Sequence, residues 1–232
     1  MCHSQVEVET GSGPARVFIE QPDGTASFVL ALTHGAGGGV DTPDLLAVRD
    51  AALRLGGVVA RVTQPYRVSG ARAPGSVARQ DAAWVEIITT LRGPPLAGPA
   101  GPLPLLQGGR SNGARVACRT AAAVDAVAVI ALAFPLRPPG RPDRSRAAEL
   151  RIPGRKLLIV SGDRDPFGVP GRRAGARVVV LAGETHALSR RPAAVGRAVA
   201  AWLPRALGLP QGQRAARGRG VDGARKSARP AG

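Results

Sequence analysis

A serine in a glycine-framed turn is the first group in this sequence that could carry out chemistry. The motif Gly-Arg-Ser-Asn-Gly at residues 109–113 follows the apolar run 103–108 and precedes a stretch with helical periodicity. A tight turn between a strand and a helix holds a serine hydroxyl outward at the end of a sheet, and the glycines let neighbouring backbone pack closely. Ser111 is therefore a candidate nucleophile. The same pattern also fits a glycine-rich turn in which the serine only caps the helix.

An aspartate and a histidine follow later apolar runs, in the chain order Ser, Asp, His. Asp165 comes after the run 156–161, and His186 comes after the run 177–181. A serine needs a base to take its proton near neutral pH, and histidine, with an ordinary pKa of about 6.5, suits that role. A carboxylate orients the imidazole and stabilises its charged form. We expect Ser111, Asp165 and His186 to form a catalytic triad.

Two acids compete with Asp165, and His186 has an alternative of its own. Asp163 lies nearer the strand end, where it could cap the turn, whereas Asp165 precedes Pro166 and so favours an extended conformation that projects outward. Glu184 is expected to be a solvated loop charge. His186 could also be an ordinary histidine of a surface loop.

A glycine-rich loop at residues 33–39 could stabilise the negative charge that develops during attack on a carbonyl. Its glycines allow the backbone to turn N–H groups inward, and we assign the oxyanion donors to the backbone N–H of Ala36 and Asn112. A phosphate-binding loop fits less well, because the chain lacks a G-K-[ST] motif and an acid at the dinucleotide-binding spacing. His34 is expected to support this loop rather than to react.

The elements that must position these groups alternate between strand and helix. Residues 5–20 predict an antiparallel hairpin at one edge of a sheet. Apolar runs predict parallel strands at residues 28–33, 58–63, 103–108, 126–134, 156–161 and 177–181. Helical periodicity predicts helices at residues 43–55, 76–91, 112–123 and 192–207. This order is typical of a doubly wound α/β domain with helices on both faces of the sheet.

The chain carries a strong positive charge, which raises the question of a nucleic-acid partner. The formal net charge is +16, and all but two of the 32 Lys and Arg residues are Arg. Because the Arg residues are scattered and aromatic residues make up only 3%, we interpret the charge as a bias of composition. Nucleic acid remains an alternative partner through residues 210–232, which predict a disordered basic tail after a single domain at residues 1–209.

Cysteine usage and hydropathy suggest where the protein acts. Cys2 and Cys118 form neither a disulfide framework nor a paired metal-ligand spacing. The start of the chain lacks the pattern of a secretory signal, and the longest apolar run, 126–134, is half of the roughly 20 residues that cross a bilayer. We expect a cytoplasmic protein that does not insert into membranes.

Four segments of the chain together resemble the α/β-hydrolase superfamily over residues 15–207. They are residues 34–37, 109–115, 133–140 and 162–168. They are similar to a capless branch that holds uncharacterised bacterial hydrolases, a testis-expressed protein and the hydrolase-like domain of a chromatin acetyltransferase complex subunit, with dienelactone hydrolases more distant. The resemblance implies an eight-stranded type of sheet, a Ser-Asp-His triad and no metal or organic cofactor.

The expected function is that of a serine hydrolase. We expect a small-molecule carboxylic ester or related acyl substrate and an acyl-serine intermediate. The alternative is a non-catalytic interaction module, since membership of a fold does not settle activity. Residues 134–150 are too short for a full cap, which predicts an open pocket. Arginines in this segment could give it an anion-favouring rim: Arg137, Arg141, Arg144 and Arg146.

Overall fold

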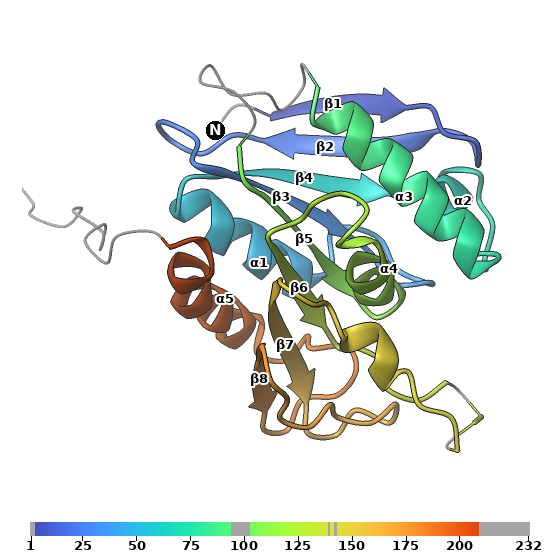
Figure 1. Ribbon diagram of the computed structural model, residues 1–232, viewed down its shortest axis with the longest axis vertical. Coiled ribbons are helices and arrows are strands. Elements are labelled where there is room, and N and C mark those ends of the chain that lie inside the picture. The colour runs from blue at the N-terminus through green and yellow to red at the C-terminus, as the bar shows by residue number, and fades with distance from the viewer. Residues whose placement is uncertain (1–2, 94–102, 139, 142, 209–232) are drawn as a thin grey trace, which may run out of the picture.

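The computed structural model describes residues 3–93, 103–138, 140–141 and 143–208, which form one layered α/β domain (Figure 1). Its centre is an eight-stranded sheet with the strand order β1-β2-β4-β3-β5-β6-β7-β8. The strands are β1 (His3–Val8), β2 (Ala15–Glu20), β3 (Phe28–Thr33), β4 (Gly57–Thr63), β5 (Leu105–Arg110), β6 (Ala128–Leu132), β7 (Lys156–Gly162) and β8 (Ala176–Leu181). Strands β3 to β8 pair in parallel, and the β1–β2 hairpin joins antiparallel at β4. The predicted fold class is confirmed.

Helices cover both faces of this sheet (Figure 1). Helices α1 (Pro43–Arg54) and α5 (Pro192–Leu207) pack on one face, and α3 (Val77–Leu91) and α4 (Asn112–Thr120) pack on the other. Strand β3 shows why a continuous apolar run is needed between the two layers. Leu30 and Leu32 face the α1 and α5 side, Val29 and Ala31 face the α3 side, and all four are buried.

Two short helices were not predicted, and α4 and β6 are shorter than expected by several residues. Helix α2 (Pro65–Val68) and the 3-10 helix η1 (Ala147–Leu150) span a single turn each, too little for a periodic pattern to show. Helix α4 ends at Thr120 and not at residue 123. Strand β6 stops before Ala133, whose φ of 44° breaks the extended conformation.

The register of the sheet brings the predicted site segments to one edge. Thr33 at the end of β3 lies opposite Gly109 on β5, and Gly162 at the end of β7 lies opposite Leu181 on β8. The segments that follow β3, β5, β7 and β8 therefore leave the sheet at the same carboxyl edge, where ligands bind in doubly wound sheets. Strand β5, which delivers Ser111, lies in the middle of the strand order.

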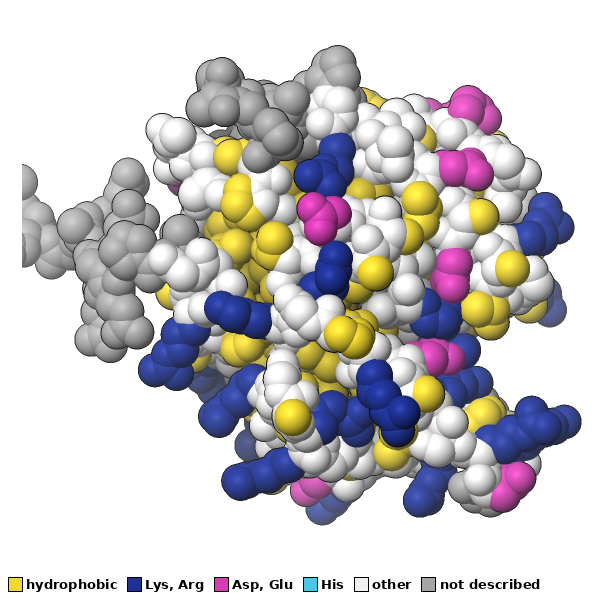
Figure 2. Space-filling view, in the orientation of Figure 1, with side chains coloured by type: hydrophobic (Ala, Val, Ile, Leu, Met, Phe, Trp, Pro, Cys, Tyr) yellow, Lys and Arg dark blue, Asp and Glu magenta, His cyan; other side chains and the backbone are white. Residues whose placement is uncertain are grey.

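The basic side chains are unevenly spread over the surface. On the face shown in Figure 2 they gather in the lower half of the view, around β7, β8 and the segment after β6, and they are sparser near β1 and α3. In the segment after β6, Arg137, Arg141 and Arg144 are exposed, but Arg146 is half-buried and donates to the carbonyl oxygen of Pro135 at 3.3 Å. Arg146 is thus a structural contact and not part of an open rim.

Two further expectations concern membrane insertion and the basic tail, and the structure describes the residues needed for only the first. Within the described ranges, no helix has both the length and the hydropathy needed to cross a membrane. The basic tail expected at residues 210–232 lies outside the described residues.

Candidate active site

Ser111 lies on a strained turn between β5 and α4. Its backbone has φ 51° and ψ −114°, a region that residues with a side chain rarely occupy. The flanking glycines explain how the turn closes. A Cβ atom at Gly109 would lie 2.6 Å from the carbonyl oxygen of Thr33, and one at Gly113 would lie 2.6 Å from that of His34. Only glycine fits at both positions, so the motif is required by the packing of β3 against the turn.

The structure brings the three predicted triad residues into one hydrogen-bonded row. The Oγ of Ser111 lies 2.9 Å from Nε2 of His186. The Nδ1 of His186 lies 2.8 Å from Oδ2 of Asp165. Because a carboxylate can only accept a hydrogen bond, Nδ1 carries the proton, and Nε2 is left free to accept the proton of the serine hydroxyl.

Asp165 is held in place from both of its oxygens. Oδ1 accepts from the backbone N–H of Phe167 at 2.9 Å, while Oδ2 faces His186. Its side chain is fully buried, so the hydrogen bonds are shielded from water. The ring of Phe167 contacts the ring of His186 edge-on, with the centroids 4.6 Å apart. These contacts fix the tilt of the imidazole.

The two competing acids have structural roles. Asp163 accepts from the backbone N–H of Gly183 at 2.7 Å, as a turn-capping residue does. Glu184 was wrongly expected to be a solvated loop charge: it is 1% exposed. Its carboxylate accepts from the backbone N–H groups of Arg190 and Arg191 just before α5, which satisfies the buried charge.

The glycine-rich loop passes directly against the serine. A Cβ at Gly35 would lie 3.3 Å from Cβ of Ser111, so Ala36, the next residue, is close to the nucleophile. The carbonyl of Ala36 accepts from the Tyr66 hydroxyl at 3.3 Å. On the other side, Asn112 begins α4, and its side-chain amide donates to Oε1 of Gln80 at 2.7 Å. Asn112 thus follows Ser111 directly, and Gly35, the neighbour of Ala36, packs against Ser111.

His34 supports this loop as a buried, neutral residue. Its Nε2 accepts from the backbone N–H of Gln64 at 3.0 Å, and its Nδ1 donates to the carbonyl oxygen of Gly35 at 2.8 Å. Burial lowers the pKa of His34, partly offset by the hydrogen bond to Gly35 and reinforced by the nearby charge of Arg67. The ring ties the loop to the segment after β4.

Arg110 and Asp44 form a contact at the site that sequence reasoning missed. Nε of Arg110 donates to Oδ2 of Asp44 at 2.9 Å, and Nη2 donates to the backbone carbonyl oxygen of His186 at 2.9 Å. Asp44, on α1, is completely buried, and its other oxygen has no hydrogen-bond partner among the described residues. An acid in the first turn of a helix and an arginine inside the motif were the only signals, and neither indicates a partner.

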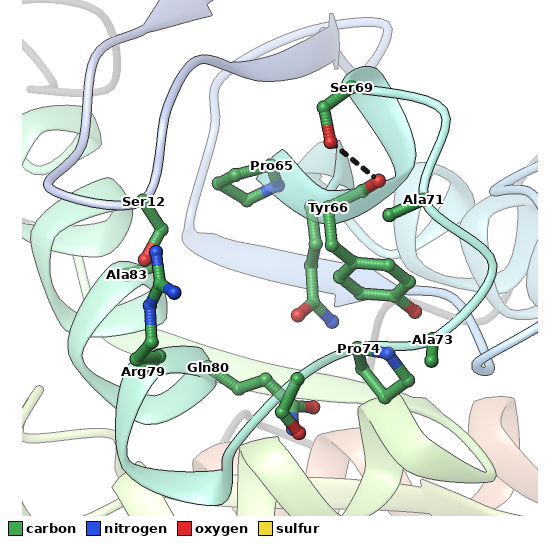
Figure 3. Close-up of a pocket in the computed structure, with 12 residues that line it drawn as sticks. Ser12, Pro65, Tyr66, Ser69, Ala71, Ala73, Pro74, Arg79, Gln80 and Ala83 are labelled. Carbon is green, nitrogen blue, oxygen red and sulfur yellow. Dashed lines mark hydrogen bonds between the residues drawn. The ribbon is translucent and has the colours of Figure 1, made fainter.

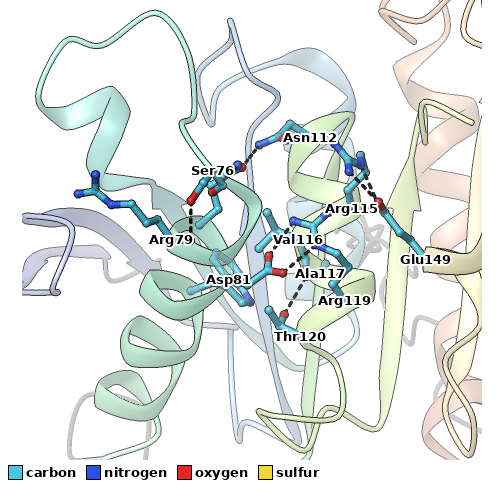
Figure 4. Close-up of polar contacts among 12 residues, drawn as sticks. Ser76, Arg79, Asp81, Asn112, Arg115, Val116, Ala117, Arg119, Thr120 and Glu149 are labelled. Carbon is cyan, nitrogen blue, oxygen red and sulfur yellow. Dashed lines mark hydrogen bonds and ion pairs between the residues drawn. The ribbon is translucent and has the colours of Figure 1, made fainter. Parts of the chain in front are cut away.

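A second ionic network ties the segment after β6 to α4 (Figure 4). Arg115 donates to both oxygens of Glu149 on η1, at 2.9 and 2.6 Å. Arg119 contacts Glu149 at 3.2 Å and binds Asp81 on α3 through two hydrogen bonds at 2.8 and 2.7 Å. Forked arginine–carboxylate pairs of this kind fix geometry well, and these hold η1 and α3 against the helix that starts at the serine.

Comparison with known proteins identifies the class to which this fold and site belong. Residues 26–188 match the model of the family described as "Alpha/beta hydrolase domain", which covers well over half of the chain. The chain belongs to that family. A search of curated proteins found no match.

Solved structures show the same fold at low sequence identity. An α/β serine hydrolase without a lid from Xanthomonas campestris superposes with a TM-score of 0.69 and 20% identity, covering 88% of this chain and 94% of that one. An esterase from Pyrobaculum calidifontis gives a TM-score of 0.62 at 16% identity over 90% and 85% of the two chains. Dienelactone hydrolase from Anabaena variabilis gives 0.66 at 19% identity over 88% and 97%.

Proposed function

We propose that this protein is a serine hydrolase that cleaves a carboxylic ester or related acyl compound through an acyl-enzyme at Ser111. The observation that carries the proposal is the continuous row from the Ser111 hydroxyl through the imidazole of His186 to the buried carboxylate of Asp165, with 2.9 and 2.8 Å between the polar atoms. Such a row activates a hydroxyl that is a weak nucleophile by itself.

The first half-reaction forms the acyl-enzyme. Oγ of Ser111 attacks the carbonyl carbon while Nε2 of His186 takes the hydroxyl proton, and the carbonyl oxygen becomes an oxyanion next to the backbone N–H groups of Ala36 and Asn112. The tetrahedral intermediate then collapses. The bond to the leaving alcohol breaks, and the alkoxide receives its proton from Nε2, so that the imidazole is neutral again.

The second half-reaction releases the acid. A water molecule gives its proton to Nε2 of His186 and attacks the acyl carbon, and the same backbone N–H groups receive the charge. When the second intermediate collapses, Ser111 leaves with the proton from His186. Throughout both steps the carboxylate of Asp165 stabilises the charged imidazolium, and its hydrogen bond from the backbone N–H of Phe167 holds it in place for that role.

We further propose that the protein belongs to the capless branch and that it acts in the cytoplasm. The four segments that resemble the capless branch of testis-expressed and chromatin-subunit proteins support placing the chain in that branch. A cytoplasmic location fits the buried free thiol of Cys118, because a reducing compartment keeps cysteines reduced.

Labelling with a fluorophosphonate probe tests the proposal. The probe phosphonylates an activated serine, so the wild type should be labelled, S111A should not, and S4A, which removes an exposed serine on β1, should be labelled normally. D165N should slow labelling strongly, whereas D163N should not, since Asp163 only caps a turn. A folded wild type that stays unlabelled would favour the alternative of a non-catalytic interaction module.

A further inference from the structure

A cavity of about 240 Å³ opens beside the glycine-rich loop, between α2 and the start of α3 (Figure 3). We call it the α2–α3 cavity. Its polar lining residues are Ser12, Gln64, Tyr66, Ser69, Arg79 and Gln80, and the rest of its wall is Ala, Pro and Gly. The volume lies below the range of about 300 to 1,000 Å³ that is usual for drug-sized ligands. The cavity therefore suits a small group.

Two residues that line the cavity form hydrogen bonds with the residues that we assign as oxyanion donors. Tyr66 donates to the carbonyl oxygen of Ala36 at 3.3 Å, and Gln80 accepts from the side chain of Asn112 at 2.7 Å. A carbonyl group bound between Ala36 and Asn112 would thus have the α2–α3 cavity directly beside it. This contact makes the cavity a candidate subsite of the same reaction.

The strand order tells which half of the substrate the cavity would hold. His186 follows β8 at one edge of the sheet, whereas α2 and α3 follow β4, and β5 with Ser111 lies between them. The leaving group must lie on the His186 side, because that imidazole delivers its proton. The acyl group then points the other way, toward the α2–α3 cavity.

The charges of the wall indicate what the acyl group carries. Of the described residues, no Asp or Glu lines the cavity, and Arg79 is its one charged lining residue. Arg79 forms no ion pair within the part of the chain that the structure describes. Burial raises the pKa of Tyr66 to about 12, so its hydroxyl stays neutral and does not repel an anion.

The positions of these side chains indicate the length of the acyl group as well as its charge. Figure 3 shows Tyr66, with Ala73 and Pro74, at one end of the cavity, and Arg79 beside Ser12 at the other. We infer that the α2–α3 cavity binds a short acyl group that ends in a carboxylate, with the carboxylate at Arg79. Resting on the proposed function, this makes half-esters of short dicarboxylic acids the substrate class.

Ethanol release from two esters of equal acyl length tests the inference. Monoethyl succinate ends in a carboxylate where ethyl butyrate ends in a methyl group. We expect the wild type to favour monoethyl succinate in kcat/KM by roughly five-fold or more, with the preference falling as salt is raised, because Arg79 is exposed. R79Q should lose the preference and R79K should keep part of it. R72Q, which removes an exposed arginine of the same segment outside the cavity lining, should keep it in full.

The outcomes separate this inference from the proposed function. Suppose that the fluorophosphonate probe labels Ser111 but ethyl butyrate is preferred, or that R79Q leaves the ratio of kcat/KM for the two esters unchanged. Either result contradicts the inferred preference for an anionic acyl group and leaves the proposal of a serine hydrolase intact. If Ser111 is never labelled and neither ester is cleaved, both fall. The salt dependence of the wild type tests the same contact without any variant, because a preference independent of salt contradicts a charge contact at Arg79.

Discussion

Nη2 of Arg110 donates a hydrogen bond of 2.9 Å to the backbone carbonyl oxygen of His186, which joins the turn of the nucleophile to the loop of the base. The two residues lie 76 positions apart in the chain. Because Nε of the same guanidinium binds the buried Asp44 on α1, the arginine cannot swing away without breaking an ion pair. The position of His186 relative to Ser111 therefore depends on a side chain that does not itself take part in the relay.

Replacing Arg110 should lower turnover more than substrate binding. R110M removes the contact with the His186 carbonyl, and a displacement of the imidazole by about 1 Å can cost on the order of 100-fold in rate. We expect kcat to fall 10- to 100-fold with KM little changed, and added guanidinium to restore part of it. Steady-state kinetics check this against R155M, whose arginine binds Ala121 and Asp125 and touches none of the triad residues. Equal kcat values in the two variants would contradict a positioning role.

The same arginine should matter for stability through Asp44. Removing one partner of a buried ion pair leaves an uncompensated charge, which costs about 3–5 kcal/mol in the free energy of unfolding. Asp44 is fully buried, so urea unfolding of R110M should show a loss of that order. Adding D44N should return much of it, because the neutral amide leaves no buried charge. If the double variant is as unstable as R110M, the loss comes from packing and not from the charge.

His34 should make the protein less stable in mild acid. Burial lowers its pKa below the ordinary value of 6.5, so the folded state binds fewer protons than the unfolded state once the pH drops below that value. The contribution of neutral His34 is full above about pH 6.5 and is lost as the pH falls toward the folded pKa. The free energy of unfolding between pH 5 and 8 should thus slope less in H34Q than in the wild type. H3Q changes an exposed histidine on β1 and should keep the wild-type slope; an unchanged slope in H34Q would mean that His34 does not titrate with folding.

The elements that sequence predicted best have a clear hydrophobic pattern. Strand β3 has the predicted bounds 28–33 because it is a continuous apolar run, buried throughout. Helix α5 has the predicted bounds 192–207 because its buried residues recur at helical spacing after Pro192. The triad residues could be proposed because each follows a recognisable strand. Their mutual distances came only from the strand order, which the sequence does not state.

The interactions that sequence could not predict are those between loops. From the sequence, Glu184 is expected to be a surface charge. In the structure it is buried, and it accepts hydrogen bonds from the backbone N–H groups of Arg190 and Arg191 just before α5. In the same way, the sequence does not distinguish Arg110 from the many other arginines of the chain, whereas in the structure it binds Asp44 on α1. Such contacts depend on how loops pack against helices, and the periodicity of the sequence does not predict that packing.

The most direct test of the central claim is to trap the acyl-enzyme. Wild-type protein mixed with 4-nitrophenyl acetate and quenched within the first turnover should release a burst of about one 4-nitrophenol per molecule. Peptide mass analysis should then find one acetyl group, on the peptide that holds Ser111 and on its hydroxyl. Release without a burst, an acetyl group on another residue, or an equal burst in S111A would contradict Ser111 as the nucleophile.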